Sequence, residues 1–144
     1  MLDGISMGRS GYSDDCIGWD LIMWRGAVAS AIRGKKGQAF LKEMLLSLDA
    51  MPEKKLIVDE LVTKTGEVCA IGSVAVTRNV NVSEVDTYDS HRIADIFGIA
   101  NALVKEIEFI NDEGQYWGRE TPEHRFERVR SWVMSQIKKE EIAS

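Results

Sequence analysis

The chain has 144 residues, of which 44% are hydrophobic and 28% are charged, a balance typical of one globular domain. The 18 Lys and Arg against 23 Asp and Glu give a net charge of −5, which is the wrong sign for a general DNA-binding protein. Two cysteines are too few for a disulfide scaffold or a four-thiolate zinc site. No apolar run approaches the roughly 20 residues that span a bilayer, so we expect a cytoplasmic protein without membrane contact.

The first 18 residues differ from the rest in composition. Residues 1–18 are rich in Gly, Ser and Asp and have no helical period, which predicts an irregular N-terminal arm. No linker, internal repeat or low-complexity tract interrupts residues 19–144. We therefore expect these residues to form a single helical domain.

Two helices are predicted after the arm. Apolar residues recur at three- and four-residue spacing over 19–33 and again over 38–50, and Pro52 ends the second pattern. Gly34 is a candidate left-handed cap for the first helix. Because the connection between the two helices is short, we expect them to form an antiparallel hairpin.

The middle of the chain allows two interpretations. Residues 56–63 are rich in β-branched side chains but also fit a short helix, so a small β-hairpin near 56–68 is left open. Residues 67–76 could form a buried strand or a closely packed helix. Their small side chains favour a helix over 69–78.

Two further helices follow a polar loop at 79–89. Ser90 is a candidate N-cap for a short helix over 91–97. Apolar residues over 99–111 share one helical face and predict a second, longer helix.

The last predicted helix has a clear start. Thr121 is followed by Pro122, an N-cap with proline at the first helical position. The helix should run to about Lys139, with Lys138 and Lys139 complementing the dipole of its last turn. The expected fold class is mainly α, a single compact domain of about five to six helices. Five inward-facing residues should share its core: Phe40, Leu45, Ile107, Val129 and Val133.

No catalytic, cofactor-binding or metal-ligating residue is assigned. Cys16 follows two acids, which raise the pKa of a thiol, and Cys69 lies in an apolar run where a buried, inert thiol is usual. The acids before Cys16 do not have the spacing of a calcium loop. The sequence therefore favours a protein that is not an enzyme and needs no cofactor.

Acidic and aromatic residues gather in two regions. Residues 80–120 carry nine acids against three Lys and Arg, a balance of −6. These acids are either a solvated helix surface or a face that attracts a basic protein partner. Gly-rich loops at 8–16 and 114–119 hold aromatic residues that could anchor such a partner. The candidate protein-binding residues are Tyr12, Asp14, Asp15, Asp112, Glu113, Tyr116 and Trp117.

Basic residues provide the alternative site. The turn from Arg33 to Lys36 could hold a phosphate, although it lacks the P-loop pattern and also reads as a solvated turn between helices. The candidate nucleic-acid-binding residues are Arg9, Arg25, Arg33, Lys35 and Lys36.

Six segments resemble a family of small proteins of tailed bacteriophages and prophages: residues 8–16, 24–28, 31–41, 66–72, 110–113 and 120–123. The likeness spans nearly the whole chain, and its most specific block is Ala-Ile-Arg-Gly-Lys-Lys-Gly-Gln-Ala-Phe-Leu at 31–41. The family offers no catalytic residues to transfer.

This resemblance implies a biological setting. Small phage accessory proteins often bind a host protein, and some of them, such as anti-CRISPR proteins, inhibit bacterial immune systems. By analogy, we expect this chain to act in the host cytoplasm by binding and inhibiting a host protein or complex, with an antiviral defence system as the expected target. The alternative is a nucleic-acid-binding phage accessory protein that uses the cluster from Arg33 to Lys36. A homodimer is left open.

Overall fold

The computed structural model describes residues 8–11, 18–113 and 120–139. The described residues form a mainly helical fold, as predicted, without a β-sheet. The helices are α1 (Gly18–Arg33), α2 (Lys35–Ala50), α3 (Ala70–Arg78), α4 (Ser90–Phe97), α5 (Asn101–Glu113) and α6 (Pro122–Gln136). None of the helices in these ranges is long and apolar enough to cross a membrane.

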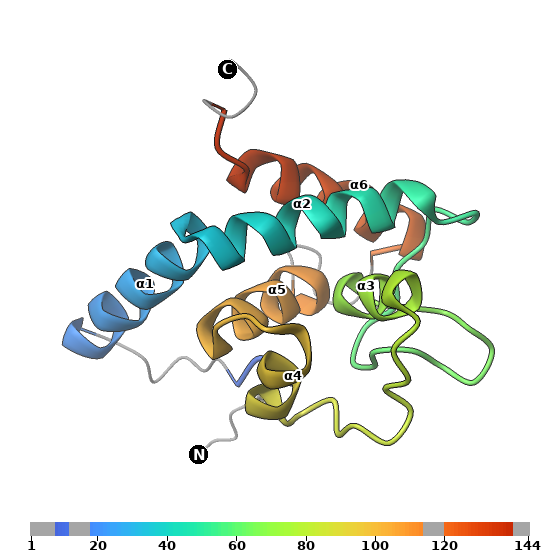
Figure 1. Cartoon of the computed structure of the whole chain (residues 1–144), viewed down its shortest axis with the longest axis horizontal. Coiled ribbons are helices and arrows are strands. Elements are labelled where there is room, and N and C mark those ends of the chain that lie inside the picture. The colour runs from blue at the N-terminus through green and yellow to red at the C-terminus, as the bar shows by residue number, and fades with distance from the viewer. Residues whose placement is uncertain (1–7, 12–17, 114–119, 140–144) are drawn as a thin grey trace.

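Helices α2 and α5 organise the packing (Figure 1). Helix α5 contacts α1, α3, α4 and α6, while α2 crosses the molecule and contacts α1, α3 and α6. Both helices present buried apolar rows to their neighbours, so a single core forms between them.

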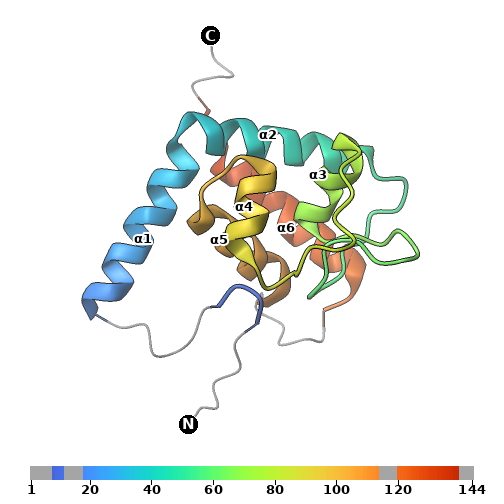
Figure 2. The same cartoon turned by 60° about the horizontal axis from the view of Figure 1, so that its bottom comes forward.

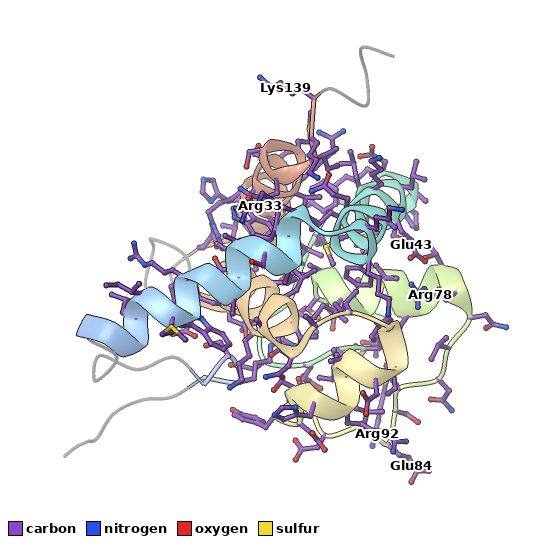
Figure 3. The ribbon with its side chains drawn as sticks, turned by 60° about the vertical axis from the view of Figure 1, so that its left-hand side comes forward. Arg33, Glu43, Arg78, Glu84, Arg92 and Lys139 are labelled. Carbon is purple, nitrogen blue, oxygen red and sulfur yellow. The ribbon has the colours of Figure 1, made fainter. Side chains whose placement is uncertain are left out.

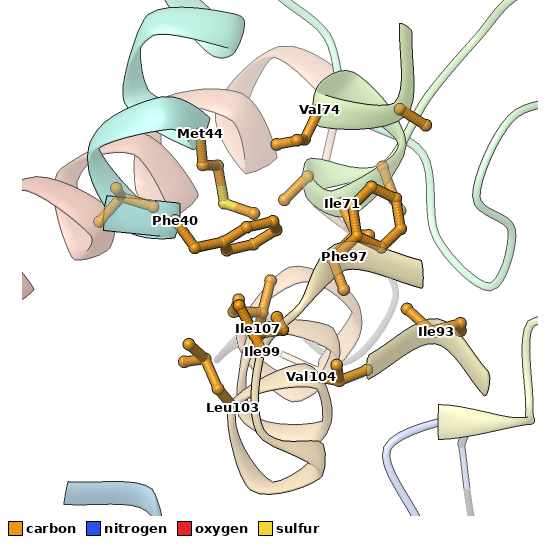
Figure 4. Close-up of a cluster of buried hydrophobic side chains, with 14 of the residues drawn as sticks. Phe40, Met44, Ile71, Val74, Ile93, Phe97, Ile99, Leu103, Val104 and Ile107 are labelled. Carbon is orange, nitrogen blue, oxygen red and sulfur yellow. The ribbon is translucent and has the colours of Figure 1, made fainter. Parts of the chain in front are cut away.

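The core brings together side chains from α2, α3, α4 and α5 (Figure 4). The rings of Phe40 and Phe97 meet edge to face, with 5.9 Å between their centroids and 69° between their planes, a favourable arrangement for aromatic pairs. Phe40, Ile107, Val129 and Val133 are buried as predicted, but the prediction for Leu45 is wrong, because this side chain is only partly buried. Met44 and Leu48 occupy the central positions of the α2 row instead.

Residues 67–76 belong mostly to a helix, α3, which the small side chains favoured over a strand. Cys69 caps the helix, since its Sγ accepts a hydrogen bond from Gly72 N at 3.4 Å. A Cβ on Gly72 would lie 1.8 Å from the carbonyl oxygen of Leu61, so this position admits only glycine. The hairpin left open near 56–68 reduces to one antiparallel bridge between Val62 and Val68.

Helix termini follow the sequence signals in part. Thr121 caps α6 as predicted, its Oγ1 accepting a hydrogen bond from His124 N at 3.0 Å. The cap of α4 is Asp89 and not Ser90, because the Asp89 carboxylate accepts from Arg92 N at 3.1 Å. Helix α6 ends at Gln136, so the two lysines predicted for its last turn lie beyond it.

Helices α1 and α2 do not form the predicted antiparallel hairpin. Gly34 alone separates them, and its backbone is extended (φ −69°, ψ 165°) where a left-handed cap was predicted. One extended residue cannot reverse the chain, so the helices diverge from a bend (Figures 1 and 2) and α1 packs on α5. We call this bend, residues 33–37, the elbow.

Candidate functional site

The predicted protein-binding residues divide into two groups. Tyr12, Asp14, Asp15, Tyr116 and Trp117 lie outside the described residues. Asp112 and Glu113 lie at the C-terminal end of α5, where both contact the short segment 8–11. They therefore serve an intramolecular contact, which the sequence did not predict.

Arg9 is the centre of that contact and is 2% exposed. Its Nε and Nη2 donate to Oδ2 and Oδ1 of Asp112 at 2.5 and 2.8 Å, a two-point pairing of guanidinium with carboxylate. Its Nη1 donates to the carbonyl oxygen of Glu60 and to Thr87 Oγ1, each at 3.1 Å, and lies 3.5 Å from Cys69 Sγ. The acceptors come from four separate parts of the chain, so Arg9 connects them. The prediction that Arg9 contacts nucleic acid is therefore contradicted.

The neighbouring segment residue adds a second tie. Ser10 Oγ donates to Glu113 Oε2 at 2.7 Å, and Ser10 is fully buried. Gly11 N donates to the carbonyl oxygen of Gly8 at 3.0 Å, which closes residues 8–11 into a turn. Part of the predicted irregular arm is thus a turn whose side chains enter the helical body.

Asn111 positions the partner of Arg9. Its Nδ2 donates to Asp112 Oδ1 at 2.7 Å and to the carbonyl oxygen of Ile57 at 2.8 Å, while its Oδ1 accepts from Ala70 N at 3.0 Å. The side chain is 1% exposed. Because one amide joins α5, α3 and the loop at 57, it fixes the carboxylate of Asp112 independently of Arg9.

Glu108 is a second buried acid, one turn before Asp112. Its Oε2 lies 3.9 Å from Arg9 Nη1, and both its oxygens lack a hydrogen-bond partner among the described residues. Burial raises the pKa of Glu108 to about 8, against the opposing pull of Arg9. Burial also lowers the pKa of Arg9, but Cys69, the hydrogen-bonded Asp112 and Glu108 together raise it above its ordinary value, so Arg9 carries its charge.

The residues around Arg9 form a set of fixed hydrogen-bond acceptors that binds a cation. Cys69 is buried and caps a helix. No group of three or more His, Cys, Asp and Glu side chains in the described ranges is placed to hold a metal ion. We use the name socket for the acceptors around Arg9: the Glu60 carbonyl, Cys69, Thr87, Glu108 and Asp112.

The acidic stretch at 80–120 does not form a single face. Four of its acids are bound inside the fold: Glu108 and Asp112 near Arg9, Glu113 with Ser10, and Glu120, whose pKa the Arg128 guanidinium lowers from 2.6 Å away. The acids of the loop before α4 and of α4 itself are exposed: Glu84, Asp86, Asp89 and Asp95. Tyr88, 58% exposed, lies among them. We call residues 84–95 the acidic segment.

Three of the predicted basic residues lie at the elbow, namely Arg33, Lys35 and Lys36, whereas Arg25 lies earlier on α1. Arg25, Arg33, Lys35 and Lys36 are all exposed. Gln38 joins the C-terminal end of α6 to the elbow, because its Nε2 donates to the carbonyl oxygens of Ile32 and Gln136 and its Oε1 accepts from Lys138 N at 2.9 Å. Figure 3 labels Arg33 and Lys139, the latter an exposed residue just past this junction.

Sequence reasoning missed three of these features. They are the burial of Arg9 against α5, the exposure of Tyr88 and the junction of Lys138 with Gln38 at the elbow. The first and the third depend on contacts between distant segments. For the burial of Arg9, the only local signal was the pair of acids at 112–113, since a buried arginine needs an acidic partner. Comparison of the chain with protein-family models, with curated proteins and with solved structures finds no match in any of the three.

Proposed function

We propose that this protein is a bacteriophage accessory protein that binds a host protein or complex and inhibits it, with an antiviral defence system as the target. The phage setting rests on the sequence resemblance described above. The observation that carries the binding role is the acidic segment, in which four exposed acids flank an exposed tyrosine along the chain.

The acidic segment offers a partner both negative charge and one aromatic contact. Exposed carboxylates accelerate encounter with a basic surface, and a tyrosine contributes a large amphipathic contact area at small entropic cost. Glu84 and Arg92, both labelled in Figure 3, lie on this part of the molecule. Glu84 and Asp95 are exposed and have no described bond within the chain, so both charges are available to a partner.

The partner is sought by co-purification. A tagged chain should recover a specific bacterial protein from a lysate, and its expression should raise phage plating on a host that carries the corresponding defence system. Recovery of no specific protein, together with unchanged plating on defence-bearing hosts, contradicts the proposal.

Variants then assign the interface. Tyr88→Ala should weaken binding of the recovered partner about tenfold or more, the loss expected when an interface anchor is truncated. Glu84→Lys should slow association and reduce its dependence on salt. Glu53→Lys is the matched control, because Glu53 is an exposed acid outside the acidic segment. Equal effects of the two charge reversals would place the interface elsewhere.

A second candidate function is nucleic-acid binding through the elbow. The observation that favours it is the bond from Lys138 N to the Gln38 side chain, which joins the end of α6 to the elbow, where Arg33, Lys35 and Lys36 are exposed. Binding to a short DNA or RNA duplex should then fall steeply with salt, because phosphate contacts release counterions. Lys35→Ala with Lys36→Ala should lower the salt slope, whereas lack of retention on nucleic acid at low salt removes this candidate.

A further inference from the structure

We propose that the helical body carries a guanidinium-binding site, the socket, which Arg9 fills as a tethered ligand and which a guanidinium compound from solution can fill once the Arg9 side chain is removed. The class of ligand is an arginine side chain or a small alkylguanidinium ion. The inference concerns the interior of the fold and is independent of the partner proposed above.

The segment is held in the manner of a bound peptide. Among the backbone-to-backbone hydrogen bonds of the described residues, its single one is internal, from Gly11 N to Gly8 O. Its described bonds to the helical body come from side chains, through Arg9 to the socket and through Ser10 to Glu113. A ligand with the same end group could therefore form the same contacts without the segment's backbone.

The socket is built without help from the segment. Asn111 holds Asp112 and is itself anchored to Ile57 and Ala70, while Asp59 N lies 3.4 Å from Asp112 Oδ1. Cys69 is fixed as the cap of α3. None of these contacts involves the Arg9 side chain, so we expect Asp112 and Cys69 to stay in position for an external donor when that side chain is removed.

The arrangement of the acceptors favours a planar guanidinium over an ammonium ion. Asp112 receives two parallel N–H bonds from Nε and Nη2, and the Glu60 carbonyl and Thr87 receive the outward N–H groups of Nη1. A guanidinium presents five donors in this fixed plane, whereas an ammonium is a point charge with three. An emptied socket also leaves the buried carboxylate of Asp112 without a cation, which favours uptake of one.

Arg9→Ala gives a direct test. The substitution removes the atoms of an ethylguanidinium ion, from Cγ outwards, and leaves the backbone turn in place. Ethylguanidinium should raise the melting temperature of this variant with a saturable dose response, and at ten times its Kd it should increase the folded-to-unfolded ratio about elevenfold. n-Propylammonium, which carries the same charge but not the planar set of N–H donors, should produce no saturable shift of the melting temperature.

A matched variant separates the socket from general salt effects. Arg130→Ala removes a partly exposed arginine that also pairs with a carboxylate, with Nε and Nη2 2.6 and 3.1 Å from the oxygens of Asp49. Ethylguanidinium should leave this variant unchanged. A shift of the same size in both variants, or an equal response to n-propylammonium, overturns the proposal.

If the Arg9→Ala variant does not fold on its own, the proposal is tested by refolding. The variant is then refolded in the presence of either ion and its helical circular-dichroism signal is measured. Recovery with ethylguanidinium alone supports the socket, and no recovery with either ion overturns it.

Discussion

The guanidinium of Arg9 grips the carboxylate of Asp112 at two points, although the residues lie 103 positions apart in the chain. Both side chains are almost completely buried, at 0% and 4% exposed. The pair fastens the start of the chain to the C-terminal end of α5. Because both charges are buried, loss of either should destabilise the fold.

Asp112→Asn should lower the free energy of unfolding by about 3–5 kcal/mol, because it leaves a buried arginine without its partner. Asp49→Asn is the matched control, since Asp49 pairs with Arg130 at the surface and such pairs contribute at most about 1 kcal/mol. Urea unfolding of the two variants measures both values. Similar losses would mean that the Arg9 pair is as solvated as the surface pair.

Glu108 should make stability depend on pH. Because its pKa is about 8 in the folded state and the usual carboxyl value in the unfolded state, the folded chain binds more protons between roughly pH 4.5 and 8. The contribution of this residue to stability therefore falls as pH rises through that window, by at most about 1.4 kcal/mol per pH unit for one proton.

Glu108→Gln removes this titration while keeping the shape of the side chain. Compared with the unsubstituted chain, the variant should gain relative stability from pH 5 to pH 8, with no further gain above that range. Chemical unfolding at several pH values gives the difference. A difference that does not change with pH would show that Glu108 is charged in both states.

Three leucines on α2 should respond according to their burial. Leu48 is fully buried, Leu45 is partly buried and Leu46 is 72% exposed. Truncation to alanine should cost about 2–5 kcal/mol at Leu48, less at Leu45 and under about 0.5 kcal/mol at Leu46. Denaturant midpoints of the three variants test the order, and an equal loss at Leu46 and Leu48 would contradict the orientation of α2.

Local patterns were sufficient to predict most helices of this fold. The apolar period located α1, α2 and α5, and the Thr121-Pro122 pair located the start of α6. On α2 the prediction was correct for Phe40 and wrong for Leu45, which lies beside the buried face that Met44 and Leu48 occupy.

Contacts between distant segments could not be predicted. Arg9 looked like a solvent-exposed basic residue in a polar arm, and its burial depends on acceptors at 60, 87 and 112 that only the folded chain assembles. The prediction that α1 and α2 form a hairpin was wrong for a similar reason. Helix α1 packs on α5, and this contact between distant segments has no local signal in the sequence. The candidate sites of the structure are therefore the buried contact of Arg9 with the socket and the acidic segment, and not the surface loops predicted from the sequence.

Gly37 and Gly26 should respond in opposite ways to alanine. A Cβ on Gly37 would lie 1.8 Å from the carbonyl oxygen of Ala31, so α1 and α2 would have to separate at the elbow. Gly26 lies within α1 with nothing within 4 Å of its would-be Cβ, and a helical glycine there is less favourable than alanine by about 0.5–1 kcal/mol. Gly26→Ala should therefore raise the melting temperature by a few degrees, whereas Gly37→Ala should lower it clearly. Because both substitutions add the same methyl group to a helix, the comparison isolates the effect of the close approach of α1 and α2 at the elbow. Stabilisation by Gly37→Ala would show that the two helices are less closely packed there than the geometry indicates.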